Sequence, residues 1–205
     1  MIGPKEKKER ALGEHLHLKG ARCQSPKCAM VRKPYPPGMH GKKRTGRGLS
    51  DFGRQLLEKQ RVKISYGIDE RALRGLFYKA QRKTGSTALG LFGMLEMRLD
   101  NVIFRLGLAP SRGAARQLIT HGHILVGGKR VRSPGYITRP NDVIALRPES
   151  ASQKTFENLR ETLKKYEAPS WLHLDLEKLE GRVVSPPTDT STPFEFNLLV
   201  ESFSK

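Results

Sequence analysis

The chain has 205 residues, of which 37% are hydrophobic, and this is enough apolar material for one or two domains with a modest core. Its 38 basic and 20 acidic residues give a net charge of +18, which is typical of proteins that bind a polyanion. No apolar run approaches the ~20 residues of a membrane span, so the composition excludes a membrane-crossing protein. The first residues lack the hydrophobic stretch of a secretory signal, and two cysteines do not suggest a disulfide scaffold, so we expect a cytoplasmic protein.

The positive charge is concentrated toward the N-terminus. Residues 1–50 carry 13 basic and 3 acidic side chains, whereas residues 149–205 carry 7 basic and 10 acidic ones. The last quarter of the chain is therefore interpreted as scaffold or protein contact rather than as a nucleic-acid surface.

Residues 1–50 lack helical or strand periodicity over any useful length, and residues 1–49 are interpreted as an N-terminal extension. The part Arg32–Gly48 is rich in Pro, Gly and basic residues, so it cannot bury enough apolar surface to fold alone. Tyr35 and His40 offer rings for stacking on bases. A flexible linker is the alternative, but the dense positive charge favours an extension that wraps RNA.

Residues 50–94 are expected to form a helical domain. One helix is predicted from the Ser50–Asp51 cap to about Ser65, and another from about Asp69 to Lys83. The segment Phe194–Phe203 is predicted to be an apolar closing element.

The segment Met97–Arg132 holds six arginines and one lysine against a single acid, Asp100. On a helix predicted over Leu95–Leu106, one stripe is apolar and a neighbouring stripe carries Arg98, Asn101 and Arg105. A planar guanidinium can contact two phosphate oxygens at once. Solvated helical faces usually mix both signs of charge, so this pattern favours RNA binding over a merely hydrated surface.

A second helix is predicted to follow, with Ser111 as its N-cap and Gly122 as its left-handed C-cap. Arg112 and Arg116 lie along the edge of its apolar face. The Gly127-Gly128 turn and the basic residues after it then predict a β-hairpin.

Short strands are predicted farther on, at Tyr136–Thr138, Val143–Leu146, Trp171–Leu176 and Arg182–Ser185. A helix capped by Ser152 and carrying Phe156, Leu159 and Leu163 is expected between them. The predicted fold class is α+β, with residues 95–180 as an RNA-binding module whose core motif is 97–148.

Cys23 and Cys28 are weak candidates for metal ligation, with His15 and His17 as further candidates. A structural zinc site normally has four ligands, usually in two close pairs, and a second cysteine pair is absent from the sequence. Two reduced structural thiols are therefore favoured over zinc, and no metal or other cofactor is expected.

The sequence shows no nucleophile elbow, zinc-protease helix or phosphate-binding loop. Arg98-Leu99-Asp100 is similar to the triplet that carries the catalytic Asp of pseudouridine synthases. Here it falls inside the predicted RNA-gripping helix, with Asp100 expected to turn away from the basic stripe. His121 and His123 are interpreted as phosphate or ribose contacts. The protein is therefore expected not to be an enzyme, and an RNA-modifying enzyme and a repressor of mRNA or DNA are kept as alternatives.

The run RLDNVIFRLGLAPSRGAARQLITHGHILVGGKRV resembles the RNA-binding module of the bacterial-type small-subunit ribosomal protein S4 family. CQSPKCAMVRKPYPPGMHG, SDFGRQLLEKQRVKISYGI, PSWLHLD and NLLVESFSK also resemble that family, so the resemblance covers nearly the whole chain. It implies a helical first domain that is completed by residues 181–205. The module, two helices on a small and mostly antiparallel sheet, is inserted into this domain.

The resemblance also implies the partners. They are small-subunit rRNA, bound directly at a helical junction of its 5′ domain to nucleate assembly of the subunit body, and neighbouring small-subunit proteins, at an interface that affects decoding accuracy. Proximity to mRNA at its entrance is implied as well, and some members repress their own operon. Neither a membrane nor a small-molecule substrate is expected.

The RNA contacts that we expect are basic, polar or aromatic side chains from three parts of the chain. They are Arg98, Asn101, Arg105, Ser111, Arg112, Arg116, His121, His123, Lys129, Arg130 and Arg132 in the module; Arg32, Lys33, Tyr35, His40, Lys42, Lys43, Arg44 and Arg47 in the extension; and Arg54, Lys59 and Arg61 in the helical domain. Zinc-bearing family members have a CxxC pair near the start. Glu6 and Glu9 occupy that region here, which removes half of such a site.

Overall fold

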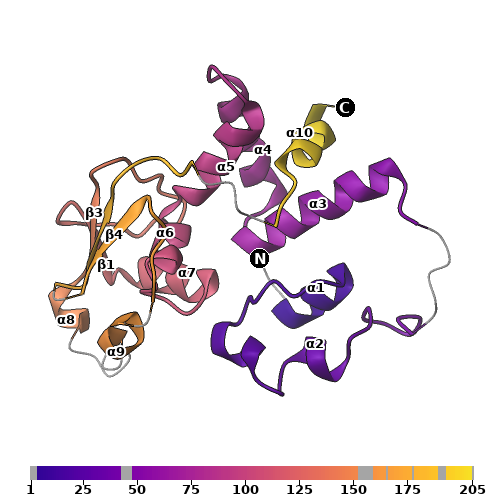
Figure 1. The fold of residues 1–205 in the computed structure, drawn as a ribbon, viewed down its shortest axis with the longest axis horizontal. Coiled ribbons are helices and arrows are strands. Elements are labelled where there is room, and N and C mark those ends of the chain that lie inside the picture. The colour runs from indigo at the N-terminus through magenta and orange to yellow at the C-terminus, as the bar shows by residue number, and fades with distance from the viewer. Residues whose placement is uncertain are drawn as a thin grey trace. The chain divides into compact units, whose positions relative to one another are not determined.

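The structure is a computed structural model that describes residues 4–42, 48–151, 159–164, 166–176, 178–188 and 193–204 (Figure 1). The chain divides into two compact units. Unit 1 comprises Met1–Phe92 and Ser191–Lys205, and unit 2 comprises Gly93–Thr190. Within the described ranges, no helix is long and apolar enough to cross a membrane.

Unit 1 begins with three short helical elements: α1 (Lys5–Leu12), the 3-10 helix η1 (Gly20–Gln24) and α2 (Ala29–Arg32). The expectation of no regular structure in residues 1–49 was therefore wrong for this part. The buried Glu9 carboxylate explains the order, because its Oε1 accepts hydrogen bonds from the backbone N–H groups of Leu16 and Leu18, both at 3.1 Å. These hydrogen bonds join Glu9 to residues that follow it by more than one helical turn, so the periodicity of the sequence does not reveal them.

Two longer helices confirm the sequence prediction. In α3 (Asp51–Tyr66) the Ser50 hydroxyl accepts from the N–H of Gly53, and in α4 (Glu70–Gln81) the Asp69 carboxylate accepts from that of Ala72. The C-terminal helix α10 (Phe196–Ser204) packs against both of them. It lies beside α3 in Figure 1, and its Phe203 ring stacks on Phe77 of α4 with ring centroids 5.0 Å apart.

The single helix predicted over Leu95–Leu106 is wrong. The structure has α5 (Thr87–Glu96), a break, and then α6 (Leu99–Arg105). Arg98 is extended, with φ −67° and ψ 137°, and forms a β-bridge with Ile137. The N–H groups of Leu99 and Asp100 donate to the carbonyls of Tyr136 and Pro134, so a distant loop supplies the partners that a continuous helix would have supplied.

Unit 2 is built on a five-stranded sheet of order β2-β1-β3-β5-β4, in which every neighbouring pair is antiparallel. Its strands are β1 (Ile124–Val126), β2 (Lys129–Arg130), β3 (Val143–Leu146), β4 (Leu172–Asp175) and β5 (Glu180–Val183). The predicted hairpin is confirmed, because Gly127 and Gly128 both have positive φ, 54° and 75°, as a type I′ turn requires.

Helices α6 and α7 (Arg112–His121) supply apolar side chains to the core of unit 2. Leu99, Ile103 and Ile119 of these helices are fully buried in one cluster with Ile124 and Ile144 of the sheet. At Gly181 of β5 an added Cβ would lie 2.3 Å from a Leu106 methyl group, so this glycine allows close approach to α6. The α+β fold class is confirmed.

Three further expectations need correction or restriction. Tyr136–Thr138 contributes only the bridge at Ile137 rather than a strand. The boundary expected between residues 180 and 181 falls inside β5, because Gly181 and Arg182 pair with both β3 and β4. The short helices α8 (Pro148–Ala151) and α9 (Leu159–Lys164) flank residues 152–158, so the predicted cap Ser152 and Phe156 lie outside the described residues.

Candidate RNA-binding surface

The arginines of α6 and α7 surround a buried carboxylate, Asp100, which is 2% exposed. Its two oxygens accept hydrogen bonds from Arg98, at 3.1 Å from Nε and 2.8 Å from Nη2. Arg116 of α7 donates to the same carboxylate at 2.7 Å. The expectation that Asp100 turns away from the basic residues was therefore wrong, and Asp100 joins the two helices by holding both guanidinium groups.

A second buried carboxylate, Glu96, holds two polar side chains of α6. It is 1% exposed and accepts from Asn101 Nδ2 at 3.0 Å and from Arg105 Nε at 3.0 Å. The Asn101 amide links Glu96 to Arg112, because its Oδ1 accepts a hydrogen bond from Arg112 Nε at 2.7 Å. The Arg112 guanidinium also lies over the Phe104 ring, 4.7 Å from its centroid. Sequence analysis missed Glu96, although its position five residues before Asn101 and nine before Arg105 was visible.

The side chains of this network differ in exposure. Arg98 and Asn101 are buried, whereas the Arg105 and Arg116 side chains are about one-third exposed, at 31% and 32%. Ser111 is also buried, and its hydroxyl caps α7 by accepting from the Ala114 N–H at 3.2 Å. The network therefore presents arginines at the surface that are already fixed from below.

The C-terminal end of α7 and the hairpin add further polar and basic groups. Gly122 has φ 77° and caps α7, as predicted, and the Arg130 guanidinium donates to the carbonyls of Gly122 and His121. His121 is exposed, while His123 is half-buried and within hydrogen-bond distance of the Ser150 hydroxyl, at 2.8 Å. Lys129 and Arg132, with Arg130, are exposed beside them.

In the N-terminal segment the structure exposes Arg32, Lys33, His40 and Lys42. The Tyr35 ring is half-buried, with Arg10 and Lys42 over it at 5.0 and 5.4 Å from the centroid. The three remaining candidates of this segment, Lys43, Arg44 and Arg47, lie outside the described residues.

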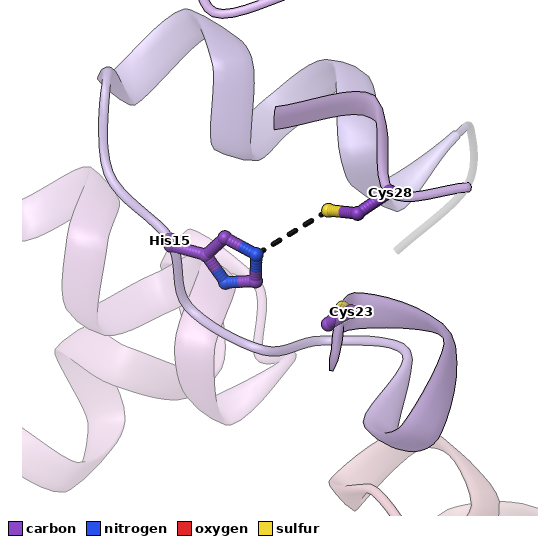
Figure 2. Close-up of side chains that lie close together, drawn as sticks. All are labelled: His15, Cys23 and Cys28. Atoms are coloured by element: carbon purple, nitrogen blue, oxygen red, sulfur yellow. Dashed lines mark hydrogen bonds between the residues drawn. The ribbon is translucent and has the colours of Figure 1, made fainter. Parts of the chain in front are cut away.

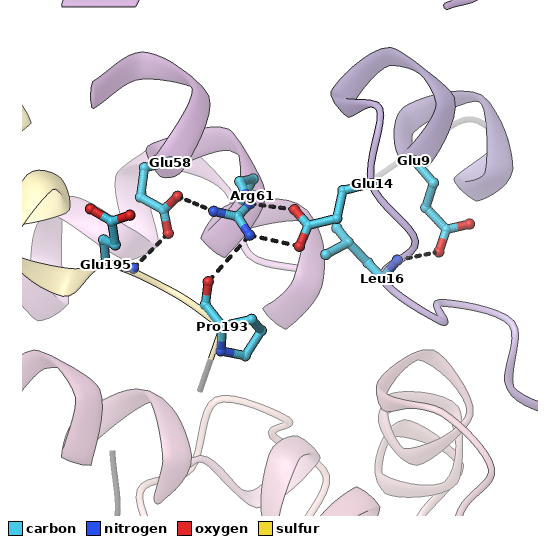
Figure 3. Close-up of polar contacts among 7 residues, drawn as sticks. All are labelled: Glu9, Glu14, Leu16, Glu58, Arg61, Pro193 and Glu195. Carbon is cyan, nitrogen blue, oxygen red and sulfur yellow. Dashed lines mark hydrogen bonds and ion pairs between the residues drawn. The ribbon is translucent and has the colours of Figure 1, made fainter. Parts of the chain in front are cut away.

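The three candidates in α3 are all engaged by acids of unit 1. Arg54 pairs with Asp51 at 2.8 Å, and Lys59 pairs with Glu70 at 3.3 Å. Arg61 donates to the carboxylates of Glu14 and Glu58 and to the carbonyl of Pro193 (Figure 3). The hydrogen bond with Glu14 is the main reason why the pKa of Arg61 is raised above its ordinary value.

The two cysteines lie together with one of the predicted histidines. The ligand atoms of His15, Cys23 and Cys28 all lie within 4.8 Å of one another, and His15 Nε2 is 3.3 Å from Cys28 Sγ (Figure 2). Two thiols and an imidazole are donors that zinc accepts, so they fit three of the four positions of a structural site. Over the described residues, no fourth member joins this group.

Glu6 and Glu9, which stand where zinc-bearing members have cysteines, are engaged otherwise. Glu6 pairs with Arg22 at 2.7 Å, and one oxygen of Glu9 binds the two amides already described. Burial is the main reason why the pKa of the Cys23 thiol is raised. The hydrogen bonds that these two carboxylates accept thus supply part of the cross-linking around η1.

Comparison with known proteins agrees with this architecture. Small ribosomal subunit protein uS4 of Thermus thermophilus is 46% identical over 206 residues, covering 100% of this chain and 98% of the relative. The chain belongs to the uS4 family. The uS4 proteins of Halothermothrix orenii and Magnetococcus marinus are 45% and 47% identical over 94% and 93% of the chain, and cover 93% and 91% of those relatives.

Two family models divide most of the chain between them. The ribosomal protein S4/S9 N-terminal domain matches residues 1–96, and the S4 domain matches residues 97–144. The S4 domain match begins in the break before α6 and includes α6, α7, β1, β2 and the first two residues of β3. It therefore contains most of the arginine network.

Proposed function

We propose that this chain is a structural protein of the small ribosomal subunit in the cytoplasm, where it binds small-subunit rRNA mainly through unit 2. One observation carries the proposal: Arg105, Arg112 and Arg116 are partly exposed while buried or half-buried partners fix their guanidinium groups. A fixed guanidinium loses less conformational freedom when it binds a phosphate, so a rigid set favours tight binding. The relatives named as small ribosomal subunit proteins support the same conclusion.

The placement of the side chains gives them different roles in this proposal. Arg98, Asn101 and Ser111 are buried and would support the surface from beneath. The direct contacts would come from Arg105, Arg112, Arg116, His121, His123, Lys129, Arg130 and Arg132, and from the exposed cations of the N-terminal segment. We also propose that binding nucleates assembly of the subunit body and contributes to accuracy, with neighbouring proteins and nearby mRNA as further partners.

The Arg112→Gln, Arg116→Gln double variant tests the proposal by filter binding to a transcript of the small-subunit rRNA 5′ domain. Asp100 keeps its two bonds from Arg98 in this variant, so the fold is retained. Losing two phosphate contacts should reduce the slope of log affinity against log salt by about 1.4. An unchanged affinity and slope would contradict the assignment of this surface.

A matched control removes two charges elsewhere in unit 2. Gly181 faces α6, so its neighbour Arg182 points to the opposite face of the sheet, and Lys178 lines the same hollow as Arg182. The Lys178→Ala, Arg182→Ala variant should bind rRNA with nearly the affinity of the wild type. Comparable losses in both variants would mean that only total charge matters.

The geometry of Asp100 argues against the alternative of an RNA-modifying enzyme. Its carboxylate is buried and bonded to two arginines, whereas a catalytic carboxylate must reach a substrate. We propose that the protein is not an enzyme. Mass spectrometry of rRNA incubated with the protein should show no altered nucleotide, and a new modification would overturn this.

A further inference from the structure

Three metal-binding side chains of unit 1 come together from separate parts of the N-terminal segment (Figure 2). His15 lies in the stretch between α1 and η1, Cys23 belongs to η1, and Cys28 is the residue just before α2. Cys28 is 0% exposed and Cys23 is 4% exposed, so both thiols lie in the interior of this segment. The structure thus adds an imidazole to the two thiols.

The spacing of the three donor atoms fits one bound ion. Zinc binds a thiolate sulfur at about 2.3 Å and an imidazole nitrogen at about 2.0–2.1 Å, so two such ligands of a tetrahedral ion lie roughly 3.6 Å apart. Here His15 Nε2 is 3.3 Å from Cys28 Sγ, and all three ligand atoms lie within 4.8 Å of one another. One zinc ion can therefore reach all three after small side-chain movements.

Two buried polar atoms of this region have no hydrogen-bond partner among the residues that the structure describes. They are Nδ1 of His15 and Oε2 of Glu9. A buried polar atom without a partner is unfavourable, and a bound ion is one feature that accounts for it. A metal-bound imidazole ordinarily donates its other N–H to a carboxylate, a carbonyl or a water. The two atoms are thus a donor and an acceptor of the kind that surround a bound metal.

The segment that carries His15 is held in place without a metal. Oε1 of Glu9 accepts hydrogen bonds from two backbone N–H groups that follow His15, both at 3.1 Å. The backbone N–H of Lys19 donates to Cys23 Sγ at 3.3 Å. These bonds fix the backbone beside the imidazole and one of the two thiols. The site is therefore formed before an ion enters it, unlike that of a classical zinc finger, which folds only with its metal.

We propose that His15, Cys23 and Cys28 bind one zinc ion in a preformed site whose fourth position is open to water. No other His, Cys, Asp or Glu of the described ranges joins the group, so the protein supplies three ligands. Zinc with three protein ligands keeps an exchangeable position, whereas a structural site has four. The ligand set differs from that of the zinc-bearing family members, because Glu6 and Glu9 stand in place of the first cysteine pair and an imidazole takes part.

The zinc content of the full-length protein tests the ligand set. Reduced protein that is stripped with a chelator and dialysed against buffered zinc should hold one zinc ion per chain, measured by elemental mass spectrometry. His15→Asn and Cys23→Ser should each lower the zinc affinity at least about tenfold, since even the hydrogen-bond partners of metal ligands contribute that much.

His17→Asn is the matched control. His17 is exposed, and its ring centroid lies 4.1 Å from that of His15, but it does not belong to the group. Asparagine also tolerates the positive φ of 53° at this position. His17→Asn should therefore bind zinc like the wild type. A wild type without stoichiometric zinc, or an equal loss of affinity in His15→Asn and His17→Asn, would overturn the inference.

Cobalt as a spectroscopic probe tests the open position. Co²⁺ in the reduced wild type should give the charge-transfer absorption of a cobalt thiolate and the visible bands of a tetrahedral ion. Adding azide or free imidazole should change the visible bands, because one position is exchangeable. A cobalt spectrum that neither ligand changes would mean a closed site and would contradict the proposed coordination.

The preformed geometry has its own readout. The far-ultraviolet circular dichroism of the wild type should be the same in zinc and in chelator, while zinc should raise the melting temperature because it binds the folded chain. The increase should vanish in His15→Asn and in Cys23→Ser. Because the increase itself is measured, a variant that starts from a lower melting temperature remains informative. A loss of helical signal when zinc is removed would refute preformation.

Discussion

At the scale of single residues, two acids hold the arginines of unit 2 in position. Judged by net charge alone, these acids would weaken RNA binding. Asp100 and Glu96 each lower the positive charge by one, yet they hold Arg98, Arg105 and Arg116 in place. A flexible arginine gives up more side-chain entropy on binding a phosphate than one that is already held. At these two positions, fixing the arginines therefore requires a carboxylate, whereas electrostatic attraction of RNA alone would favour its removal.

The Asp100→Asn variant tests which of these two effects on rRNA affinity is larger. If charge alone mattered, removing an acid would raise affinity for rRNA. We expect instead a loss of about three- to tenfold in affinity, because Arg116 loses its anchor. We also expect a loss of about 3 kcal/mol in the free energy of unfolding, because Arg98 stays buried without a charged partner. Filter binding and urea denaturation measure the two effects.

Asp142→Asn is the charge-matched control for Asp100→Asn. Asp142 accepts from the backbone N–H of Arg139 and holds neither of the Asp100-bound arginines. It should leave rRNA affinity unchanged or slightly raised. A gain in affinity for Asp100→Asn equal to that of Asp142→Asn would refute the positioning role.

At the scale of elements, the sequence predicted those whose signals are local. The caps of α3 and α7 and the Gly127-Gly128 turn depend only on residues that are close neighbours in the sequence. The break before α6 did not follow, because its hydrogen bonds come from a loop far downstream, around Pro134–Tyr136. The arginines were found by spacing, whereas their burial and partners depend on tertiary contacts that spacing does not contain.

The contact between α3 and α4 leads to a prediction about pH. Hydrogen bonding and charge from Lys63 and Lys59 outweigh the opposing effect of burial and lower the pKa of Glu70. A lowered folded-state pKa means that the stabilisation is present above the unfolded-state pKa and is lost as the pH falls through the folded-state value.

Glu70→Gln should therefore be less stable than the wild type at pH 7, by no more than about 1 kcal/mol because the side chain is partly exposed. The difference should shrink as the pH falls below the ordinary glutamate value of 4.5. Urea denaturation from pH 7 to pH 3 would measure it. A difference that stays constant across this range would show that the ion pairs do not stabilise α4.

At the scale of the whole molecule, unit 1 is closed by residues from widely separated parts of the chain. Arg61 of α3 joins Glu14, which follows α1, to the Pro193 carbonyl, which precedes α10 (Figure 3). Glu58 completes the link by accepting from the Glu195 N–H at 2.9 Å. The sequence analysis assigned Arg61 to the RNA contacts. Its actual partners come from distant segments of the chain, and the sequence alone does not show that they meet.

Arg61→Ala should consequently be a stability variant more than a binding variant. It leaves the buried Glu58 carboxylate without its cation, so the free energy of unfolding should fall by about 3 kcal/mol. Arg54→Ala removes the same charge from the same helix but breaks only an exposed pair, and should cost at most about 1 kcal/mol. Once folded at low temperature, both variants should bind rRNA with similar affinity. A large affinity loss for Arg61→Ala alone, with unchanged stability, would return Arg61 to the RNA-binding surface.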